Sequence, residues 1–385
     1  MQLTGLRVRG YRSIVDLALP LKRVNVIVGP NGCGKTNLYR SLVLLGAAAR
    51  GQLARTLAAE GGMPSALWAG DRSRIVKRNK PVRLRIEVRL EDGFEYELAC
   101  GLPPPGRGAI DPDLGEVRTL FSLDPEVKEE TLLNRAGRRA VKLLHRKGPG
   151  ATLRDESGKR VQYPLELGHS ESVLAQLSEP FRYPELCMAR DAFRGWRFYH
   201  QFRTDHGSPI REPQVAIQTE VLADDGVDLV CALQTIVELG LGREALEEAI
   251  AFALPQITAF RAEEVGDGRL RLALDVAGLS RRMDARELSD GTLRYLCLVA
   301  ALMSPRPPSV LALNEPETSL HPDLIAPLAG LIAGAAEHSQ IWVTTHSRAL
   351  AARVEQLTGE APIELEMAEG ETRIAGSDPE SLLLW

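Results

Sequence analysis

Residues Val24–Thr36 read VNVIVGPNGCGKT, and the rest of the chain is interpreted outward from this stretch. Its first five residues are mostly β-branched and apolar, which is typical of a buried strand. Gly29–Thr36 fits the spacing G-x-x-x-x-G-K-[ST] of a phosphate-binding loop. Thr36–Arg50 follows as a predicted helix. Because the motif requires a strand before it and a helix after it, we favour a phosphate loop over a chance glycine turn.

The residue types in this loop suit a bound phosphate. Glycines let successive backbone N–H groups turn toward the anion, and the following helix presents its positive N-terminal end. Lys35 is expected to reach the β- and γ-phosphates, and the Thr36 hydroxyl can ligate Mg²⁺. The nucleotide contacts expected from the loop and the helix start are Asn31, Gly32, Cys33, Gly34, Lys35, Thr36 and Asn37.

A second motif precedes a long apolar helix predicted at Gly291–Met303. Glu287–Leu293 reads ELSDGTL, so that Ser289 and the Gly291 backbone would lie at the N-terminus of that helix. A helix N-terminus can contact a γ-phosphate. Ser-Asp-Gly is also an ordinary turn and helix cap, and both interpretations stay open at this point.

Two further motifs end predicted strands. Ser309–Pro322 reads SVLALNEPETSLHP, an apolar strand with acidic residues at its tip. Glu315 at that tip is either a general base or an exposed cap, and we favour catalysis because the motifs occur in the order that a nucleotide site requires. Val343–Ser347 reads VTTHS and places His346 at the end of the next strand, where a lone histidine would usually be structural.

The remaining pattern predicts further strands and helices. Alternating residues predict an antiparallel sheet from Val82–Leu90, Glu95–Cys100, Val117–Leu123 and Ala140–Leu144. His206–Pro213 is expected to be a linker. Helices are predicted at 172–177, 184–194, 227–238, 243–252 and 322–336, and strands at 3–9, 16–19, 196–200, 257–264, 269–276, 310–313 and 340–344.

Taken together, these segments resemble the SMC/RecF-like branch of ABC ATPases, and more narrowly the small stand-alone AAA_21-type predicted ATPases. The similarity lies in YRSI from Tyr11, GPNGCGKTNL, NEPETSLHP and TTHS, and it is loose between about Gly51 and Asp284. It implies an α/β fold, a P-loop NTPase with an ABC-type head. That fold has a mainly parallel core sheet, an antiparallel β-subdomain and a helical signature subdomain. Residues 1–205 would form lobe I with the phosphate loop, and residues 206–385 would form lobe II with the later motifs, the two lobes sharing one core.

The resemblance also implies an activity. Such proteins are Mg²⁺-dependent ATPases in which two copies close on two ATP molecules, each held between one copy's phosphate loop and the other copy's signature loop. Glu315 then matches the general base, His346 the switch histidine, and Ser289 with Gly291 the signature loop. Arg12 in YRSI matches a basic position that contacts phosphate in some relatives, although a surface arginine is an equally good interpretation. The implied catalytic residues are Glu315, His346 and Lys35, and the implied metal ligands are Thr36, Asn314 and, as the Q-loop candidate, Gln201.

Asn314 departs from the family pattern, which has aspartate before the catalytic glutamate. That aspartate normally holds Mg²⁺, often through a water molecule. An amide can accept from a metal-bound water but brings no charge, and outer-shell partners of a metal typically matter about 10–100-fold. Two hypotheses follow: a slow ATPase, or a nucleotide-gated regulatory binding module with little turnover.

Composition restricts location and partners. A net charge of −4 gives no global preference for nucleic acid, and five cysteines without ligand spacing argue against disulfides or zinc. No apolar run reaches a membrane span, so we expect a cytoplasmic protein without membrane contact. Basic runs at Arg72–Lys80 and Arg135–Lys147 are either solvated faces or phosphate-contacting surfaces. By family analogy we expect an ATP-dependent homodimer that acts on DNA or on a partner protein, in repair, chromosome maintenance or phage defence.

Overall fold

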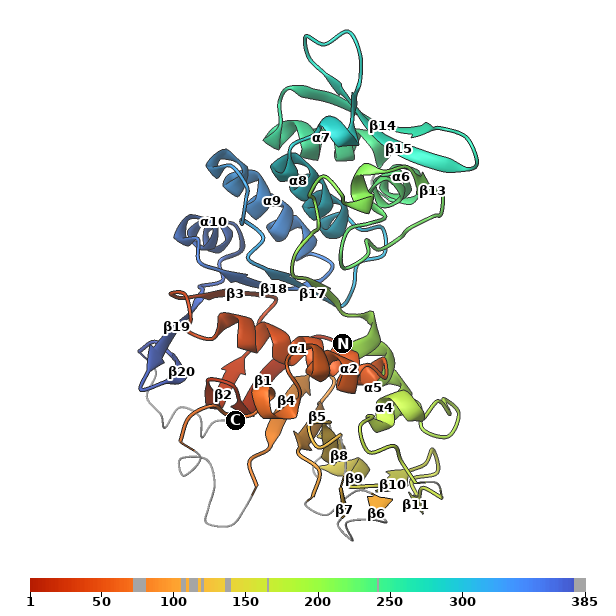
Figure 1. Cartoon of the computed structure of the whole chain (residues 1–385), viewed down its shortest axis with the longest axis vertical. Helices are drawn as coiled ribbons and strands as arrows, with labels where there is room; N and C mark the ends of the chain where they lie inside the picture. The colour runs from red at the N-terminus through yellow and green to blue at the C-terminus, as the bar shows by residue number, and fades with distance from the viewer. Residues whose placement is uncertain are drawn as a thin grey trace. The chain divides into compact units, whose positions relative to one another are not determined.

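The computed structural model describes residues 1–71, 81–104, 109–110, 117–118, 121–135, 140–164, 166–240 and 242–376 (Figure 1). The chain forms two compact units. Unit 1 comprises Met1–Lys22, Gly29–Trp196 and Glu364–Trp385, and unit 2 comprises Arg23–Val28 and Arg197–Ile363. The division into lobes at residue 205 stays a prediction.

Unit 2 contains a parallel sheet whose strands are almost entirely buried. Its order is β12 (Arg197–Tyr199), β17 (Val310–Asn314), β18 (Gln340–Thr345) and β3 (Val24–Val28), and every neighbouring pair is parallel. Short continuous apolar runs are typical of such two-sided burial, so the predicted parallel core sheet is confirmed. Because the strands are parallel, their carboxyl ends all lie at one edge, where Asn314 pairs with Thr344.

Helices and a second sheet complete unit 2. Helices α8, α9 and α10 lie on one face of the parallel sheet (Figure 1). A small antiparallel sheet has the order β13, β15, β14, with β16 paired to β15. The helices are α6 (Leu229–Leu239), α7 (Gly242–Ala253), α8 (Asp290–Leu302), α9 (Ile325–Ala335) and α10 (Arg348–Thr358), and the strands are β13 (Gln214–Val215), β14 (Ile257–Glu264), β15 (Arg269–Val276) and β16 (Met283–Asp284).

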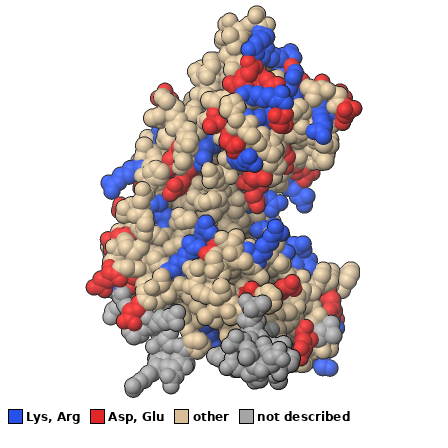
Figure 2. Space-filling view, in the orientation of Figure 1, with Lys and Arg blue, Asp and Glu red and all other residues tan. Residues whose placement is uncertain are grey.

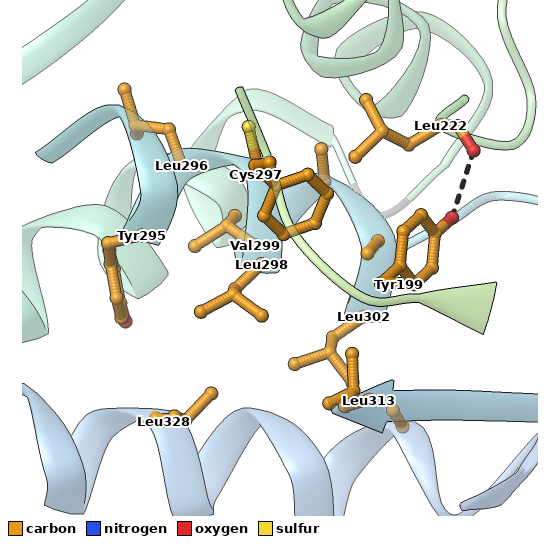
Figure 3. Packing of buried hydrophobic residues seen from close by; sticks show 14 of the residues in the cluster. Tyr199, Leu222, Tyr295, Leu296, Cys297, Leu298, Val299, Leu302, Leu313 and Leu328 are labelled. Carbon is orange, nitrogen blue, oxygen red and sulfur yellow. Dashed lines mark hydrogen bonds between the residues drawn. The ribbon is translucent and has the colours of Figure 1, made fainter. Parts of the chain in front are cut away.

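The helix that follows the ELSDGTL motif is the centre of the hydrophobic core of unit 2. All residues of α8 from Leu293 to Leu302 are buried. Figure 3 shows its side chains between Tyr199, Leu313 and Leu328. The Tyr199 hydroxyl donates a hydrogen bond of 2.9 Å to the Leu222 carbonyl, which satisfies its only polar group in the core. Helix α8 is therefore fixed by its buried side chains, while its N-terminus is exposed.

Unit 1 is built on an eight-stranded antiparallel sheet of order β11-β10-β9-β8-β5-β4-β1-β2, which confirms the predicted β-subdomain. Helix α1 contacts α2, α4 and α5. The strands are β1 (Leu3–Tyr11), β2 (Ile14–Pro20), β4 (Leu84–Leu90), β5 (Phe94–Gly101), β8 (Glu126–Asn134), β9 (Val141–Lys147), β10 (Gly150–Arg154) and β11 (Arg160–Gln162). The helices are α1 (Lys35–Ala49), α2 (Leu53–Ala59), α3 (Met63–Ala66), α4 (Val173–Gln176) and α5 (Pro184–Gly195). Two hairpins are β6 (Ala109–Ile110) with β7 (Val117–Arg118), and β19 (Ile363–Ala368) with β20 (Glu371–Ile374).

Two sequence predictions are wrong. In the strand expected at Val117–Leu123, Val117 and Arg118 form β7 but Phe121–Leu123 forms a turn, and residues 119 and 120 lie outside the described residues. The expected linker His206–Pro213 contains a turn of 3₁₀-helix, in which Ile210 and Arg211 are buried. Ile210 belongs to the hydrophobic cluster of unit 2, so the segment packs against the core. The basic run Arg72–Lys80 lies outside the described residues. No helix among the described residues is both long and apolar enough to cross a membrane.

Candidate functional site

The phosphate loop in unit 1 has a backbone that requires glycine at its end. Gly34 has φ of +103°, and a Cβ there would lie 2.1 Å from the Thr372 Oγ1. A side chain would therefore be strained and would collide with β20. Asn31 and Gly32 are exposed, whereas Cys33 is buried, so that the Cys33 thiol is not available to an anion.

Lys35 is the first residue of α1 and is buried. Its Nζ donates to the carbonyls of Gly29 at 2.7 Å and Pro30 at 3.1 Å, inside the turn of the loop. No described side chain caps the N-terminus of α1. A positive helix end without a side-chain cap and an ammonium group inside the same loop form a site suited to a polyphosphate.

The polar residues after Lys35 have different environments. Thr36 is partly exposed. The Asn37 Nδ2 donates to the Ser13 Oγ at 2.8 Å, and the Ser13 Oγ lies 2.7 Å from the Thr372 Oγ1. The Thr372 amide also donates to the Ser13 carbonyl at 2.8 Å. Asn37 therefore ties the start of α1 to the β1–β2 turn and to β20, a structural role that the sequence did not reveal.

Arg12 is engaged by a buried carboxylate. It has φ of +49°, and its Nη2 donates to the Glu60 Oε2 at 2.7 Å. The Tyr11 hydroxyl donates to the same oxygen at 2.8 Å, and the Arg40 Nη1 donates to the Glu60 Oε1 at 3.0 Å. Burial, with the Glu60 charge, raises the pKa of Tyr11 far above its ordinary value. The phosphate contact of Arg12 stays a prediction, because Glu60 holds the guanidinium here.

Asn314 ends β17 at the carboxyl edge of the parallel sheet in unit 2. It is buried, and its Oδ1 accepts a hydrogen bond of 2.8 Å from the Thr344 Oγ1 on β18. An amide oxygen has two lone pairs, so one acceptor position remains for a metal-bound water. The position is thus suited to outer-shell contact, but without a charge.

Glu315 occupies a strained turn directly after β17. Its φ is +48°, its amide donates to the Thr344 carbonyl at 2.8 Å, and its own carbonyl accepts from the Arg294 Nη2 at 3.3 Å. One third of its side chain is exposed. Strained residues that the surrounding structure holds in place cluster at functional sites. The backbone of Glu315 is therefore fixed while its carboxylate stays accessible.

His346 follows β18 and lies beside two carboxylates. Its Nδ1 is 3.9 Å from the Glu315 Oε2 and 3.5 Å from the Glu317 Oε1. Sequence reasoning missed Glu317, whose side chain is only 6% exposed. The second acidic residue of NEPET was the signal available. The structure thus brings Asn314, Glu315 and His346 together and adds Glu317 to them.

The ELSDGTL loop is confirmed as a helix cap in unit 2. The Ser289 Oγ accepts from the Thr292 amide at 3.1 Å, and Ser289 itself is exposed. A Cβ on Gly291 would lie 3.1 Å from the Ser319 carbonyl, so that the loop approaches the turn after Glu315 closely. Capping does not exclude contact with a phosphate, because the residue remains open to solvent.

Arg211 holds this loop from the segment expected to be a linker. It is buried, and its Nη1 donates to the carbonyls of Ala285 at 2.9 Å and Leu288 at 2.8 Å. Its Nη2 donates to the Asp290 Oδ1 at 2.6 Å. One arginine thus holds two main-chain carbonyls before the exposed Ser289 and the side-chain carboxylate of Asp290 directly after it. A single arginine in a polar stretch gave no sequence signal for this role.

The donors present fit a hydrated Mg²⁺. Among the described residues, no group of three or more His, Cys, Asp or Glu is placed to hold a metal ion. Mg²⁺ usually keeps several waters and takes few protein ligands besides substrate phosphates, so such a cluster is not required. Taken separately, the Thr36 hydroxyl in unit 1 and the remaining lone pair of the Asn314 Oδ1 in unit 2 are oxygen donors of the kind that Mg²⁺ takes. Gln201 is exposed and lies two residues beyond β12, which ends at the same sheet edge as β17.

The charged surface is mixed in sign. Figure 2 shows red and blue side chains interspersed over β14 and β15 on the face in view. Arg271 of β15 and Arg282 each pair with Glu263 of β14 at 2.7 Å. The basic run Arg135–Lys147 is partly structural. Arg146 is fully buried, and its Nη2 donates to the Gly168 carbonyl at 2.6 Å. Arg146 is therefore not available to contact phosphate from the surface.

A phosphate loop after β3, an acidic turn after β17 and a histidine after β18 define the class of P-loop ATPases with an SMC/RecF-like, ABC-type head. The sequence profile described as "AAA domain, putative AbiEii toxin, Type IV TA system" matches residues 24–137 and 149–352, and the chain belongs to this family. No curated protein matches the chain.

Solved structures are similar in fold. An SMC head bound to the C-winged helix domain of ScpA is 14% identical, with a TM-score of 0.51 and coverage of 99% of each chain. The Smc head domain with an extended coiled coil from Pyrococcus furiosus, bound to the C-terminal domain of ScpA, is 12% identical, with a TM-score of 0.50, and the match covers 100% of this chain and 98% of that one. Similarity at this level of identity shows the fold alone.

Proposed function

We propose that this protein binds ATP with Mg²⁺ and hydrolyses it while two copies close on two nucleotides. The observation that carries the proposal is the carboxyl edge of one parallel sheet. Glu315 follows β17, His346 follows β18, and the phosphate loop begins directly after the next strand, β3. Ligands of open α/β sheets bind at the carboxyl ends of the strands.

Each residue has a proposed task. The Lys35 ammonium exchanges the carbonyls of Gly29 and Pro30 for the β- and γ-phosphates, and the amides of the loop bind the same oxygens. Glu315 accepts a proton from the attacking water, and His346 donates a hydrogen bond to the γ-phosphate. The Ser289 hydroxyl of a second copy contacts the γ-phosphate from the opposite side.

Thr36 would hold Mg²⁺ directly and Asn314 through a water molecule, with Gln201 as a further ligand. The ion would neutralise charge on the β- and γ-oxygens. Because Asn314 is uncharged, the second candidate function is a nucleotide-gated regulatory module with little turnover. In that case ATP binding and dimerisation persist, but phosphate release is negligible.

Phosphate release and nucleotide binding test these alternatives. We expect Glu315→Gln to bind ATP normally and to lose on the order of a hundredfold or more in rate, since it removes the base. Lys35→Met should lose ATP binding itself. Glu247→Gln is a matched control on α7, because Glu247 pairs with Arg243 and Arg261. If the wild type releases phosphate no faster than Glu315→Gln, the enzyme proposal is wrong and the regulatory module remains.

The target of this cycle is proposed to be DNA or a partner protein. The two solved SMC heads are each bound to a domain of ScpA, which supports a protein partner by analogy. Binding to DNA that requires ATP and weakens steeply with salt would identify nucleic acid, because phosphate contacts release counterions. ATP-dependent dimers without such affinity would favour the protein partner.

A further inference from the structure

Glu317 is a buried carboxylate that has no task in the reaction proposed above. Its Oε1 accepts hydrogen bonds from the Thr345 hydroxyl, from the His346 amide at 3.2 Å and from the Ser347 amide at 3.3 Å. A buried charge is tolerated when several donors satisfy it. The three donors are consecutive residues, from Thr345 at the end of β18 to His346 and Ser347 in the turn that follows it. Glu317 therefore holds this turn through its main chain, independently of the imidazole.

The second carboxylate oxygen has no such support. Glu317 Oε2 is buried without a hydrogen-bond partner among the described residues, and so is the Nε of Arg294 on α8. Burial lowers the pKa of Arg294, and the neighbouring charges of Glu317 and Glu315 oppose that shift. The two groups are thus opposite charges in one buried region. Unsatisfied buried polar groups call for an explanation beyond stability.

Arg294 connects this region to the signature loop. Its Nη2 donates to the Glu315 carbonyl at 3.3 Å, and it lies in the helix that Ser289 caps. Gly291 of the same helix start approaches the Ser319 carbonyl, at the other end of the acidic turn. The N-terminal part of α8 therefore touches both ends of the turn that carries Glu315 and Glu317.

We propose that Glu317 and Arg294 are positioning residues of this ATPase, with Glu317 fixing the turn that presents His346 and Arg294 fixing the main chain of Glu315. The inference rests on the proposed function. A contact made by Ser289 is then transmitted to Glu315 through α8. Glu317 keeps His346 in a fixed position relative to Glu315. Neither residue needs to touch the nucleotide.

Hydrogen exchange tests the role of Glu317 without ATP. We expect Glu317→Ala to speed exchange of the His346 amide by on the order of tenfold, since its bond to a charged acceptor is lost. The Ser347 amide keeps a bond of 2.9 Å to the Thr345 hydroxyl and should change less. Glu247→Ala is the matched control, because Glu247 also accepts a backbone amide, that of Phe260 at 3.2 Å. It should leave exchange at residues 346 and 347 unchanged. Unchanged exchange in Glu317→Ala overturns the proposal whether or not the protein hydrolyses ATP.

Kinetics separate positioning from a purely structural role. Glu317→Ala should lower kcat by about 10–100-fold with unchanged ATP affinity, as outer-shell residues do. Adding His346→Ala should then cost little more, because the two residues act as a unit. Full additivity, or a parallel loss of ATP affinity, would assign Glu317 to stability alone. If the wild type itself is inactive, the proposed function fails. The exchange experiment would still show whether Glu317 fixes the turn that carries His346.

Arg294 is tested by two substitutions. Arg294→Met removes the charge and the bond to the Glu315 carbonyl, and it should lower kcat by about tenfold without changing ATP affinity. Arg294→Lys keeps the charge beside Glu317 and should retain more activity than Arg294→Met. Equal losses in both variants, or no loss in either, would remove Arg294 from the proposal.

Discussion

At the scale of single residues, Asn314 shows how one amide changes the expected chemistry. Its side chain is buried, and its Oδ1 accepts from the Thr344 hydroxyl at 2.8 Å. An aspartate oxygen can accept the same bond, so the substitution changes charge while the packing is kept. The site is therefore suited to measuring what the missing charge does.

Asn314→Asp is expected to lower the Mg²⁺ concentration for half-maximal activity by about 10–100-fold, because an outer-shell carboxylate strengthens metal binding by that order. Magnesium titrations of phosphate release and of nucleotide binding would measure it. Asn314→Ala, which removes the oxygen, should raise the required concentration. The same midpoint in all three proteins would show that position 314 does not act on the metal.

Arg146 is the opposite case, a residue in a basic run that is structural. It is fully buried, donates to the carbonyls of Gly148 at 2.8 Å and Gly168 at 2.6 Å, and lies 3.7 Å from Glu130. The Glu130 carboxylate also accepts from the Ser172 hydroxyl at 2.6 Å and the Val173 amide at 2.9 Å. The basic run Arg135–Lys147 therefore does not present all of its basic side chains at the surface.

Arg146→Met should destabilise unit 1 by about 3–5 kcal/mol, since it leaves the buried Glu130 charge and the carbonyls of Gly148, Gly168 and Glu171 without their cationic partner. Urea unfolding followed by circular dichroism would measure the loss. Lys147→Met changes the neighbouring exposed side chain and should stay within about 0.5 kcal/mol of wild type. An Arg146→Met protein as stable as the Lys147→Met control would contradict the structural role.

At the scale of elements, the sequence predicted those strands and helices that a periodic pattern or a motif marks. The bounds of β3, β14 and β15 were predicted to the residue, because alternation or a continuous apolar run marks them clearly. Strand β8 was missed, since EVKEETLLN carries its charges inside salt bridges and the buried Glu130 network. Helix α10 and the β19–β20 hairpin were also missed, because neither contains a motif that sequence reasoning used.

The same limit applies to the candidate site. Lys35, Glu315 and His346 could be proposed from the sequence because each occupies a motif with a known order, and their roles stay predictions. Glu317 and Arg211 were missed because their roles depend on burial and on backbone carbonyls or amides far apart in sequence. Polar contacts between residues far apart in sequence do not produce a periodic pattern in the sequence. Such residues are visible only once the strands and turns are in place.

Arg211 makes the most specific prediction at this scale. Arg211→Ala removes the donor that fixes the carbonyls of Ala285 and Leu288 and the carboxylate of Asp290. We expect faster hydrogen exchange between residues 285 and 291 and a stability loss of about 1–3 kcal/mol, from buried acceptors left without a partner. Arg286→Ala, which removes an exposed ion pair with Glu212, should change neither quantity appreciably. Exchange unchanged in Arg211→Ala would mean that the loop is held by its own cap.

At the scale of the whole molecule, the proposed cycle requires a second copy. Ser289 lies on the surface at the N-terminus of a helix whose following turns are buried. Surface exposure allows contact with a second chain, and the rigid helix behind it makes that contact sensitive to position. The oligomeric state with and without ATP therefore tests the account more directly than the rate of hydrolysis does.

In the Glu315→Gln background, where ATP should persist, we expect ATP and Mg²⁺ to shift the mass in solution from 42.1 kDa toward twice that value. Ser289→Arg should prevent the shift, because its bulk and charge would occupy the contact surface, and multi-angle light scattering would show a monomer.

Ser289→Gly controls for the lost cap, which costs only a few tenths of a kcal/mol. Thr258→Arg places the same charge at an exposed position of β14, and the protein should still dimerise. Because nucleotide binding to each phosphate loop does not require Ser289, Ser289→Arg should still bind ATP as a monomer. A Ser289→Arg dimer that forms with ATP would show that the copies meet through another surface.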